Sequence, residues 1–448
     1  MGRLFGTDGV RGVAGVDLTE ELAYKLGRAG ADVLGRKYES PVFVIGRDTR
    51  VSGKNLENAL AKGIIYAGGR VVNLGIITTP AVAYLAREES AAAGAVISAS
   101  HNPYRDNGIK FFNGEGYKLD DAVEDEIETA MRSLTDTSME CEIDTKCISK
   151  EYEAEDIYIN YLMSTFDRRL DGMKIALDCA NGASFRVAPE LYKRLGAEVA
   201  AMGIEPDGKN INDGVGSTHT ERFRAFVQDR GAEVGFAFDG DADRLIVIDE
   251  NGNEINGDKT ICLCAGMLKK NGRLKGNKVT ATIMSNIGLH RYVEAIGGNV
   301  DVTAVGDRYV LESMRNTGCV IGGEQSGHII FLDYSTTGDG ILSSLQFTKA
   351  WMDSGKTTSQ FADEVHLYPQ ALENASVSKD GKEKYSSDPD IVKAIEEAEE
   401  SLEGKGRVLI RPSGTESLVR VMIEGEHPDE ISEMAGKLAK LISNKFPQ

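Results

Sequence analysis

The segment 95–103 reads Ala-Val-Ile-Ser-Ala-Ser-His-Asn-Pro, and the rest of the chain is organised around it. Its apolar half predicts a buried strand. Its polar half predicts a rigid loop, because Pro103 has no N–H and disfavours helix at the preceding residue. Ser100 then stands at the carboxyl end of the strand, the edge where open α/β sheets bind ligands. Within this segment alone, turn and cap hydrogen bonds are the better explanation of Ser100 and Asn102.

The residues around this segment alternate between apolar strands and amphipathic helices. Strands are predicted at 41–45, 71–77 and 95–97, and helices at 19–36, 52–68 and 80–89. Ser52 is expected to cap the second helix and Gly68 to end it. Strands that are apolar along their whole length, with helices between them, are typical of largely parallel sheets covered on both faces.

The same order of strand and helix returns twice further along the chain. One repeat runs from the strand 173–178 to the strand 234–238, and the other from 278–283 to 319–323. In all three repeats the last strand leads into a polar loop, at 98–110, 239–244 and 324–328. Chance would rarely place polar loops with reactive side chains after the last strand of all three repeats. The repeat therefore favours a ligand site at Ser100 over a plain turn.

The rest of the chain predicts a smaller and differently built domain. Segment 134–155 is polar and strand-poor, so a boundary is expected near it, and 365–390 is expected to be irregular. The tail then predicts helix 391–402, strand 406–410, loop 411–417, strand 418–424 and helix 428–446. We therefore predict an α/β fold: three related α/β/α domains with mixed, largely parallel sheets, plus a smaller C-terminal α+β domain. The expected domains are 1–154, 155–256, 257–366 and 367–448.

The composition is that of a globular protein, with 41% hydrophobic and 27% charged residues among 448. No apolar run is long enough to cross a bilayer, and the first residues lack the apolar core of a signal peptide, so we expect a cytoplasmic protein. The net charge of −19 argues against nucleic acid and membranes as partners. The six cysteines lack a metal-site spacing and are expected to be reduced.

Three carboxylates alternate in the second polar loop. Asp239, Asp241 and Asp243 stand between two apolar strands, which hold them together although they repel one another. A calcium loop of the EF-hand type needs glycine at its sixth position, where this chain has Arg244. The other alternative is a solvated acidic turn. A divalent cation relieves the repulsion most simply, and oxygen-only sites that act on phosphates commonly hold Mg²⁺. We predict one Mg²⁺ per chain here.

The tail loop carries the ingredients of a phosphate site. Arg411 offers bidentate contacts, and Gly414 exposes backbone N–H groups. Ser413 and Thr415 offer hydroxyls, and Arg420 lies on the strand that leaves the loop. The lysine of a nucleotide-binding P-loop is missing, so a triphosphatase is not indicated. For this loop by itself, an ordinary polar hairpin is a competing interpretation.

The third polar loop combines several kinds of hydrogen-bonding group. Glu324, Ser326 and His328 offer a carboxylate, a hydroxyl and an imidazole that can titrate near neutral pH, a mixture that suits sugar hydroxyls better than a metal. A hydroxyl nucleophile, a metal, a polyol-binding loop and a separate phosphate clamp together indicate phosphoryl transfer on a sugar phosphate. An esterase fits worse, because His101 adjoins Ser100 in sequence and the chain has no Gly-x-Ser-x-Gly elbow.

These motifs, in this order and over nearly the whole chain, resemble those of the α-D-phosphohexomutase superfamily. Its phosphoserine, metal, sugar and phosphate loops are matched by 98–103, 239–244, 324–328 and 411–416. The segment 4–12 and Gln325 resemble the branch that acts on glucosamine phosphates rather than the phosphomannomutase/phosphoglucomutase branch. Ser417 departs from the glucosamine branch, where proline is usual; the departure removes no anion ligand.

The resemblance implies four domains around a central cleft and Ser100 carried as phosphoserine. It implies Mg²⁺ held by that phosphate and by Asp239, Asp241 and Asp243. Phosphate would move between O6 and O1 of glucosamine through a bisphosphorylated sugar, so a sugar bisphosphate would act as primer. The single clamp in the tail would then have to accept either end of the sugar.

The resemblance also assigns expected roles to the basic residues of these loops. Arg11, His101, Lys110 and Arg244 are expected to assist proton transfer or charge stabilisation, and which residue is the general base stays open. The expected partner is a phosphorylated hexosamine or hexose, and the chain is expected to be a monomer or a homodimer. Two other functions stay open: a phosphomannomutase/phosphoglucomutase, and a non-catalytic sugar-phosphate-binding protein with unmodified Ser100.

Overall fold

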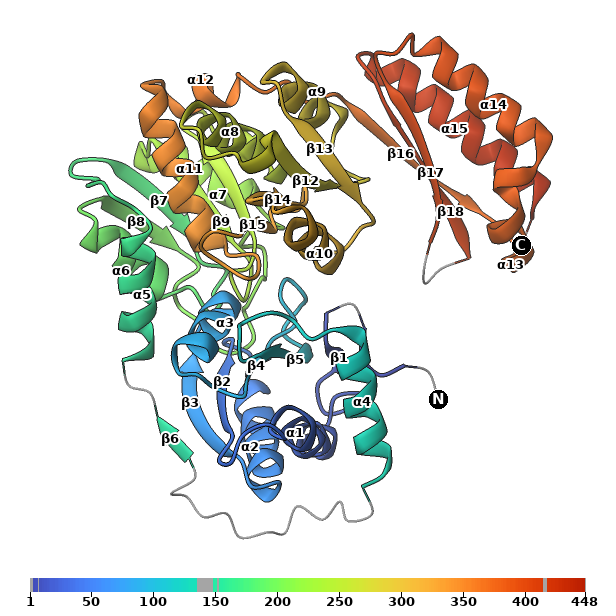
Figure 1. Ribbon diagram of the computed structural model, residues 1–448. Coiled ribbons are helices and arrows are strands. Elements are labelled where there is room, and N and C mark those ends of the chain that lie inside the picture. The colour runs from blue at the N-terminus through green and yellow to red at the C-terminus, as the bar shows by residue number, and fades with distance from the viewer. Residues whose placement is uncertain (1–2, 7, 135–147, 151–152, 414–416, 448) are drawn as a thin grey trace. The chain divides into compact units, whose positions relative to one another are not determined.

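The structure is a computed structural model that describes residues 3–6, 8–134, 148–150, 153–413 and 417–447. The chain forms two compact units. The first contains Met1–Met284 and Ile296–Glu364, and the second contains Ser285–Ala295 and Val365–Gln448. Three sheets lie in the first unit and one in the second (Figure 1). Among the described helices, none is both long and apolar enough to cross a membrane.

The first sheet has six strands in the order β1-β5-β4-β2-β3-β6. These strands are β1 (Val10–Val13), β2 (Val42–Arg47), β3 (Arg70–Ile76), β4 (Ala93–Ile97), β5 (Asp106–Asn113) and β6 (Ile148–Lys150). The pairs among β4, β2, β3 and β6 are parallel, and the pairs of β5 with β1 and β4 are antiparallel. The accompanying helices are α1 (Glu20–Leu34), α2 (Gly53–Tyr66), α3 (Thr79–Glu88) and α4 (Asp121–Arg132).

Alternate residues of β2 face two different layers of helix. Phe43 and Ile45 belong to the core that α1 and α2 cover. Val44 lies on the other face, where it and Val82 of α3 surround Gly94. Burial on both faces explains why these strands are apolar along their whole length, as the sequence pattern predicted.

Local chemistry sets how α1 and α2 begin and pack. Thr19 caps α1, and its side chain accepts a backbone N–H of the first turn. Ser52 stands at the cap position of α2 but makes no capping bond there. Its hydroxyl instead accepts a hydrogen bond from Asn107 Nδ2 at 2.9 Å, so the expected cap is wrong in its chemistry. The two helices approach closely at Gly27, where a Cβ would lie 2.2 Å from the carbonyl oxygen of Leu60.

The second sheet has the order β11-β10-β9-β7-β8. Its strands are β7 (Lys174–Asp178), β8 (Glu198–Met202), β9 (Val234–Phe238), β10 (Leu245–Asp249) and β11 (Glu254–Ile255). The pairs β7–β8 and β7–β9 are parallel, whereas β10 runs antiparallel to β9 and to β11. The helices of this region are α5 (Ala154–Ser164), α6 (Val187–Arg194) and α7 (Glu221–Arg230).

The third sheet has the order β13-β12-β14-β15. Its strands are β12 (Lys278–Thr282), β13 (Asn299–Thr303), β14 (Ile321–Gly323) and β15 (Ile329–Phe331), and only the β14–β15 pair among them is antiparallel. Its helical segments are α8 (Gly257–Lys270), η2 (Lys275–Asn277), α10 (Asp307–Thr317), α11 (Gly340–Ser354) and α12 (Thr358–Ala362). The three sheets confirm the predicted fold class of mixed, largely parallel α/β domains.

The second unit is an antiparallel sheet covered by helices (Figure 1). Its strands are β16 (Gln370–Ser376), β17 (Arg407–Pro412) and β18 (Leu418–Glu424), in the order β16-β18-β17. Its helical segments are α9 (Ile287–Ala295), α13 (Lys379–Lys384), η3 (Tyr385–Ser387), α14 (Pro389–Ser401) and α15 (Pro428–Lys445).

The expectation that 365–390 is irregular is wrong, because β16 and α13 lie within it. In β16 only Ala371 and Ala375 are buried, while Leu372 is exposed. Two small buried alanines give a weaker strand signal than the β-branched runs of the other sheets.

Candidate active site

The serine loop (98–103) follows β4, whose five residues are all buried. Ser100 is 1% exposed and has a φ of +52°, a conformation that non-glycine residues adopt only at a cost. Its Oγ donates a hydrogen bond to Asp239 Oδ2 at 2.6 Å. His101 Nδ1 lies 3.3 Å from Ser100 Oγ. The predicted nucleophile therefore lies beside the predicted metal ligands.

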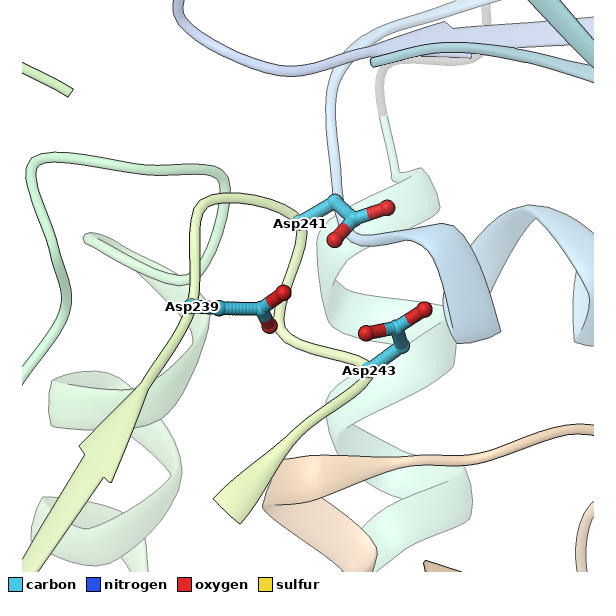
Figure 2. A group of neighbouring side chains, drawn as sticks. All are labelled: Asp239, Asp241 and Asp243. Atoms are coloured by element: carbon cyan, nitrogen blue, oxygen red, sulfur yellow. The ribbon is translucent and has the colours of Figure 1, made fainter. Parts of the chain in front are cut away.

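The aspartate loop (239–244) connects β9 to β10. Asp239, Asp241 and Asp243 are 0%, 0% and 4% exposed, and one carboxylate oxygen of each lies within 4.8 Å of the others. Figure 2 shows the three carboxylates turned toward one common space. Gly240 allows the loop to lie against the serine loop, because a Cβ there would be 2.6 Å from the carbonyl oxygen of Ser100.

Burial and neighbouring charges govern the pKa values of Asp239 and Asp243 in the aspartate loop. Burial, Asp243 and Asp241 raise the pKa of Asp239 well above its ordinary value. Burial alone would raise the pKa of Asp243 as well, but His328, Lys110 and Arg244 hold it below its usual range. Among the described residues, Asp241 Oδ1 and Asp243 Oδ1 are buried without a hydrogen-bond partner. A divalent cation would satisfy both oxygens.

Cationic side chains border the aspartate loop. Lys110 is 2% exposed, and its Nζ lies 3.2 Å from Asp241 Oδ2 and 3.9 Å from Asp243 Oδ2. Burial opposes its charge, but these carboxylates raise the pKa of Lys110. Arg244 donates its backbone N–H to Asp239 Oδ1 at 3.2 Å. Three of the four predicted helper residues, His101, Lys110 and Arg244, thus lie around Ser100 and the carboxylates.

Arg11 of β1 reaches the same region through Asp8. Its guanidinium pairs with Asp8, whose Oδ2 lies 3.0 Å from Lys110 Nζ. Burial would raise the pKa of Asp8, but Lys110, Lys118 and Arg11 hold it well below its ordinary value. Asp8 therefore stays ionised and ties the N-terminal loop to the site.

The sugar loop (324–328) is joined to the aspartate loop by backbone bonds. Arg244 and His328 form an antiparallel bridge, and Leu245 N–H donates to the Gly327 carbonyl at 3.0 Å. The His328 ring is buried, with Nδ1 3.6 Å from Asp243 Oδ2. Burial opposes its charge, yet Asp243 raises the pKa of His328. Glu324 Oε1 accepts the backbone N–H of Gly306 at 3.1 Å.

Ser326 is exposed at the tip of the sugar loop. Glu324, Ser326 and His328 therefore lie in a loop whose backbone is hydrogen-bonded to the segment of the aspartate loop.

The predicted phosphate loop belongs to the second unit. Arg411 lies in β17 rather than in the loop, and its partner on the neighbouring strand β18 is Arg420. Burial and the positive charge of Arg420 lower the pKa of Arg411. Ser413 is 5% exposed and donates its N–H to the Leu418 carbonyl at 2.9 Å. The predicted ligands Gly414 and Thr415 lie outside the described residues.

Several residues of the site were missed by sequence reasoning. Lys118 Nζ lies 2.6 Å from Asp8 Oδ1 and also pairs with Asp307, whose Oδ2 is 3.5 Å from His328 Nε2. Thr79 donates its hydroxyl to Asp241 Oδ2 at 2.6 Å. Thr79 follows a predicted strand and was detectable by its place, whereas Lys118 and Asp307 carry no local signal.

Models of the phosphoglucomutase/phosphomannomutase domains match the chain along its length. The α/β/α domains I, II and III match residues 2–138, 156–252 and 256–368, and the C-terminal domain matches 372–441. The chain belongs to the phosphoglucomutase/phosphomannomutase family. The resemblance to the α-D-phosphohexomutases that its motifs indicated is therefore confirmed.

Full-length relatives and solved structures agree with this assignment. The phosphoglucosamine mutase of Acetivibrio thermocellus is 52% identical over 451 residues and covers 100% of both chains. A phosphoglucomutase/phosphomannomutase family protein of Burkholderia thailandensis has a TM-score of 0.81 at 23% identity, covering 99% of this chain and 97% of that one. The N-acetylphosphoglucosamine mutase of Aspergillus fumigatus, solved with GlcNAc-6P and magnesium, has a TM-score of 0.70 at 16% identity, covering 98% and 95%. These last two likenesses show the fold.

Proposed function

We propose that this protein interconverts glucosamine 6-phosphate and glucosamine 1-phosphate through a phosphoserine at Ser100. The observation that carries the proposal is the 2.6 Å contact between Ser100 Oγ and Asp239 Oδ2, which joins a buried hydroxyl to three clustered carboxylates. The choice of glucosamine rests on the name of the full-length relative at 52% identity.

The proposed reaction consists of two phosphoryl transfers that leave the enzyme unchanged. In the first, the P–O bond to Ser100 Oγ breaks, a bond forms to O1 of glucosamine 6-phosphate, and the O1 proton passes to a base. The resulting bisphosphate turns over in the site. In the second transfer, the phosphoryl group on O6 returns to Ser100, O6 takes up a proton, and glucosamine 1-phosphate leaves. A sugar bisphosphate can therefore prime an unphosphorylated enzyme.

We further propose that Asp239, Asp241 and Asp243 hold one Mg²⁺ together with the phosphate of Ser100. Two buried carboxylate oxygens without a partner among the described residues, on a donor set made only of oxygen, fit this cation. When bound, Mg²⁺ offsets the negative charge of the phosphoryl group. The ammonium of Lys110 and the guanidinium groups of Arg11 and Arg244 stabilise the same charge from the protein side.

Two sets of residues would hold the sugar phosphate during these transfers. We assign the sugar hydroxyls to Glu324, Ser326 and His328. The phosphate that does not react goes to the clamp made by Arg411, Ser413, Gly414, Thr415 and Arg420. The neighbouring positions of Arg411 and Arg420 on paired strands support this assignment, because two guanidinium groups side by side attract a phosphate.

A panel of sugar phosphates tests the proposal. The purified protein, with Mg²⁺ and glucose 1,6-bisphosphate as primer, is given glucosamine, glucose and mannose 6-phosphates in parallel. We expect turnover only with glucosamine 6-phosphate. We also expect about 80 Da of added mass on the intact protein from the phosphoryl group. A preference for mannose or glucose phosphates would replace glucosamine as substrate. Absence of turnover with every sugar, and of the added mass, would contradict a mutase.

A further inference from the structure

Beneath the serine loop lies a buried ion pair that the proposed reaction leaves unused. Arg50 and Asp48 are 1% and 0% exposed, and Arg50 Nε lies 3.1 Å from Asp48 Oδ2. Asp48 directly follows β2, the parallel neighbour of β4. Burying two charges is costly unless their remaining hydrogen-bonding capacity is satisfied. The other contacts of the pair therefore show what it serves.

The remaining donors of Arg50 point at the backbone of the serine loop. Its Nη2 donates to the carbonyl oxygens of Ser100 and Asn102, both at 2.9 Å, and its Nη1 lies 3.5 Å from that of Pro103. One guanidinium thus serves three carbonyls around the nucleophile. Such reach requires the planar fork of arginine, which also stays charged when buried.

Asn212 binds two of the same carbonyls. It lies in the segment between β8 and β9 of the second sheet. Asn212 Nδ2 donates to the carbonyl oxygens of Ser100 and Asn102 at 2.9 and 3.1 Å. We call Arg50 and Asn212 together the carbonyl clamp. The loop is fixed from its N–H side as well, because Ser100 N–H donates to Ser98 Oγ, which in turn donates to Asp48 Oδ2 at 2.7 Å.

The carbonyl clamp holds Ser100 in a backbone conformation that is unfavourable for a non-glycine residue. Ser100 has a φ of +52°, and a strained residue keeps such a conformation only where its surroundings enforce it. The carbonyl of Ser100 also packs against Gly240 of the aspartate loop, so a shift of this carbonyl would change how the two loops fit. Small shifts at reacting atoms are expensive: about 1 Å of misplacement can cost a hundredfold in rate.

We propose that Arg50 and Asn212 are positioning residues that hold Ser100 in the geometry for phosphoryl transfer, both when it carries phosphate and when it is free. This inference rests on the proposed function. The hydrogen bonds of the clamp go to the carbonyls of the loop, so we expect its loss to slow the transfer step and to leave substrate affinity unchanged.

Two variants and one control test the clamp. Arg50→Lys keeps the charge but loses the fork. Asn212→Gly removes the amide and suits the φ of +59° at this position. Arg47→Lys is the matched control, because Arg47 ends β2 and its side chain contacts Glu57 Oε2 at 2.8 Å and the Asp48 carbonyl at 3.3 Å rather than the carbonyls of the serine loop.

Each protein is phosphorylated with glucose 1,6-bisphosphate, which is checked by intact mass, and is then mixed with excess glucosamine 6-phosphate. Formation of glucosamine 1-phosphate in the first turnover is followed over a range of sugar concentrations, because the proposed cycle returns a phosphoryl group to Ser100 and leaves the mass of the protein unchanged. We expect the maximal rate to fall about 100-fold in Arg50→Lys and about tenfold in Asn212→Gly. The half-saturating concentration should stay within about threefold of the parent's, and Arg47→Lys should match the parent throughout.

Either folded variant with the parent's maximal rate would overturn the inference, as would a loss confined to the half-saturating concentration. If thermal melting shows that Arg50→Lys does not fold, Asn212→Gly decides the matter by the same criteria. A parent protein that takes up no phosphoryl group, or does not give it to the sugar, would instead overturn the proposed function.

Discussion

Asp178 and the aspartate loop lie at the carboxyl ends of adjacent parallel strands, yet their carboxylates differ in their hydrogen-bond partners. Asp178 is the last residue of β7, and both its oxygens are filled by N–H groups of the protein: Ala180 N–H at 2.9 Å and Gly216 N–H at 2.7 Å. In the loop that follows β9, by contrast, Asp241 Oδ1 and Asp243 Oδ1 are buried without a donor among the described residues.

The difference separates a carboxylate satisfied by the protein from the carboxylates that we propose to hold Mg²⁺. Burial raises the pKa of both Asp178 and Asp239, so a raised pKa alone does not separate them. Asp178 does not belong to the cluster of carboxylates, whereas Asp239 lies close to two like charges. What marks the site is therefore a set of like charges with oxygens left open, and not burial itself.

The comparison predicts its largest effect on activity. Asp241→Asn should lower kcat at least about 10²-fold, because the site loses a ligand charge, while the new amide can donate to the neighbouring carboxylates and preserves folding. Asp178→Asn should keep kcat within about threefold at temperatures well below its melting transition. Mutase rates at saturating sugar measure both. An equal loss in Asp178→Asn would erase the distinction between the two regions.

The sequence predicted the fold well where strands are buried on both faces, since such strands are apolar throughout. It failed at β16, whose buried face consists of Ala371 and Ala375. It also predicted a free loop at Arg411, where β17 continues, because an arginine on a half-exposed strand carries no strand signal. Periodicity thus identifies layers of the core and loses strands that pack through small residues.

For the site, the sequence identified groups that stand close together in one loop. The alternating Asp239, Asp241 and Asp243 are recognisable because their spacing is local. Lys118 and Asp307 pair across 189 positions, and no pattern in either neighbourhood announces that contact. Arg50 was equally hidden, since its role depends on carbonyls about fifty positions away. Contacts made only by tertiary packing lie beyond sequence reasoning.

A pH series would sharpen the contrast through Asp178, whose pKa burial raises to about 6. The unfolded chain ionises this group near pH 4, so between about pH 4 and 6 the folded state holds the extra proton and stability falls as pH rises. Asp178→Asn cannot titrate. From pH 4 to 7 the parent should therefore lose about 2–3 kcal/mol relative to the variant.

The stabilities of the parent and of Asp178→Asn are compared by thermal melting at matched ionic strength across this range. Parallel curves for the two proteins would show that Asp178 has an ordinary pKa. A divergence that grows below pH 4 instead would point to another carboxylate, because Asp178 is protonated in both states there.

Metal binding should distinguish the two regions by stability alone. Mg²⁺ at about 100 times its Kd should stabilise the parent by about 2.7 kcal/mol, since it binds the folded carboxylate cluster and not the unfolded chain. Asp178→Asn should respond like the parent, and Asp241→Asn should lose most of the response. The melting midpoint is recorded against Mg²⁺, with K⁺ at equal ionic strength as control. A full response in Asp241→Asn would place the cation elsewhere.

The smallest effect is expected at two threonines, Thr79 and Thr49. Thr79 supports the aspartate loop, and Thr49 supports the loop that follows Asp178. Thr79 donates its hydroxyl to Asp241 Oδ2, and Thr49 donates its hydroxyl to the carbonyl of Asn181, beside Asp178; both bonds measure 2.6 Å. Both residues are buried, so valine replaces each with little change in shape.

Thr79→Val should weaken Mg²⁺ binding about tenfold, because the hydroxyl orients a ligand carboxylate and such supporting partners typically contribute this much. Thr49→Val should leave Mg²⁺ affinity unchanged and cost about 1 kcal/mol of stability through the lost hydrogen bond. Titration calorimetry with Mg²⁺ gives the affinities, and thermal melting gives the stabilities. If Thr49→Val weakened Mg²⁺ binding as much as Thr79→Val, the loop of Asp178 would be part of the metal site, and the division drawn between the two strand ends would fail.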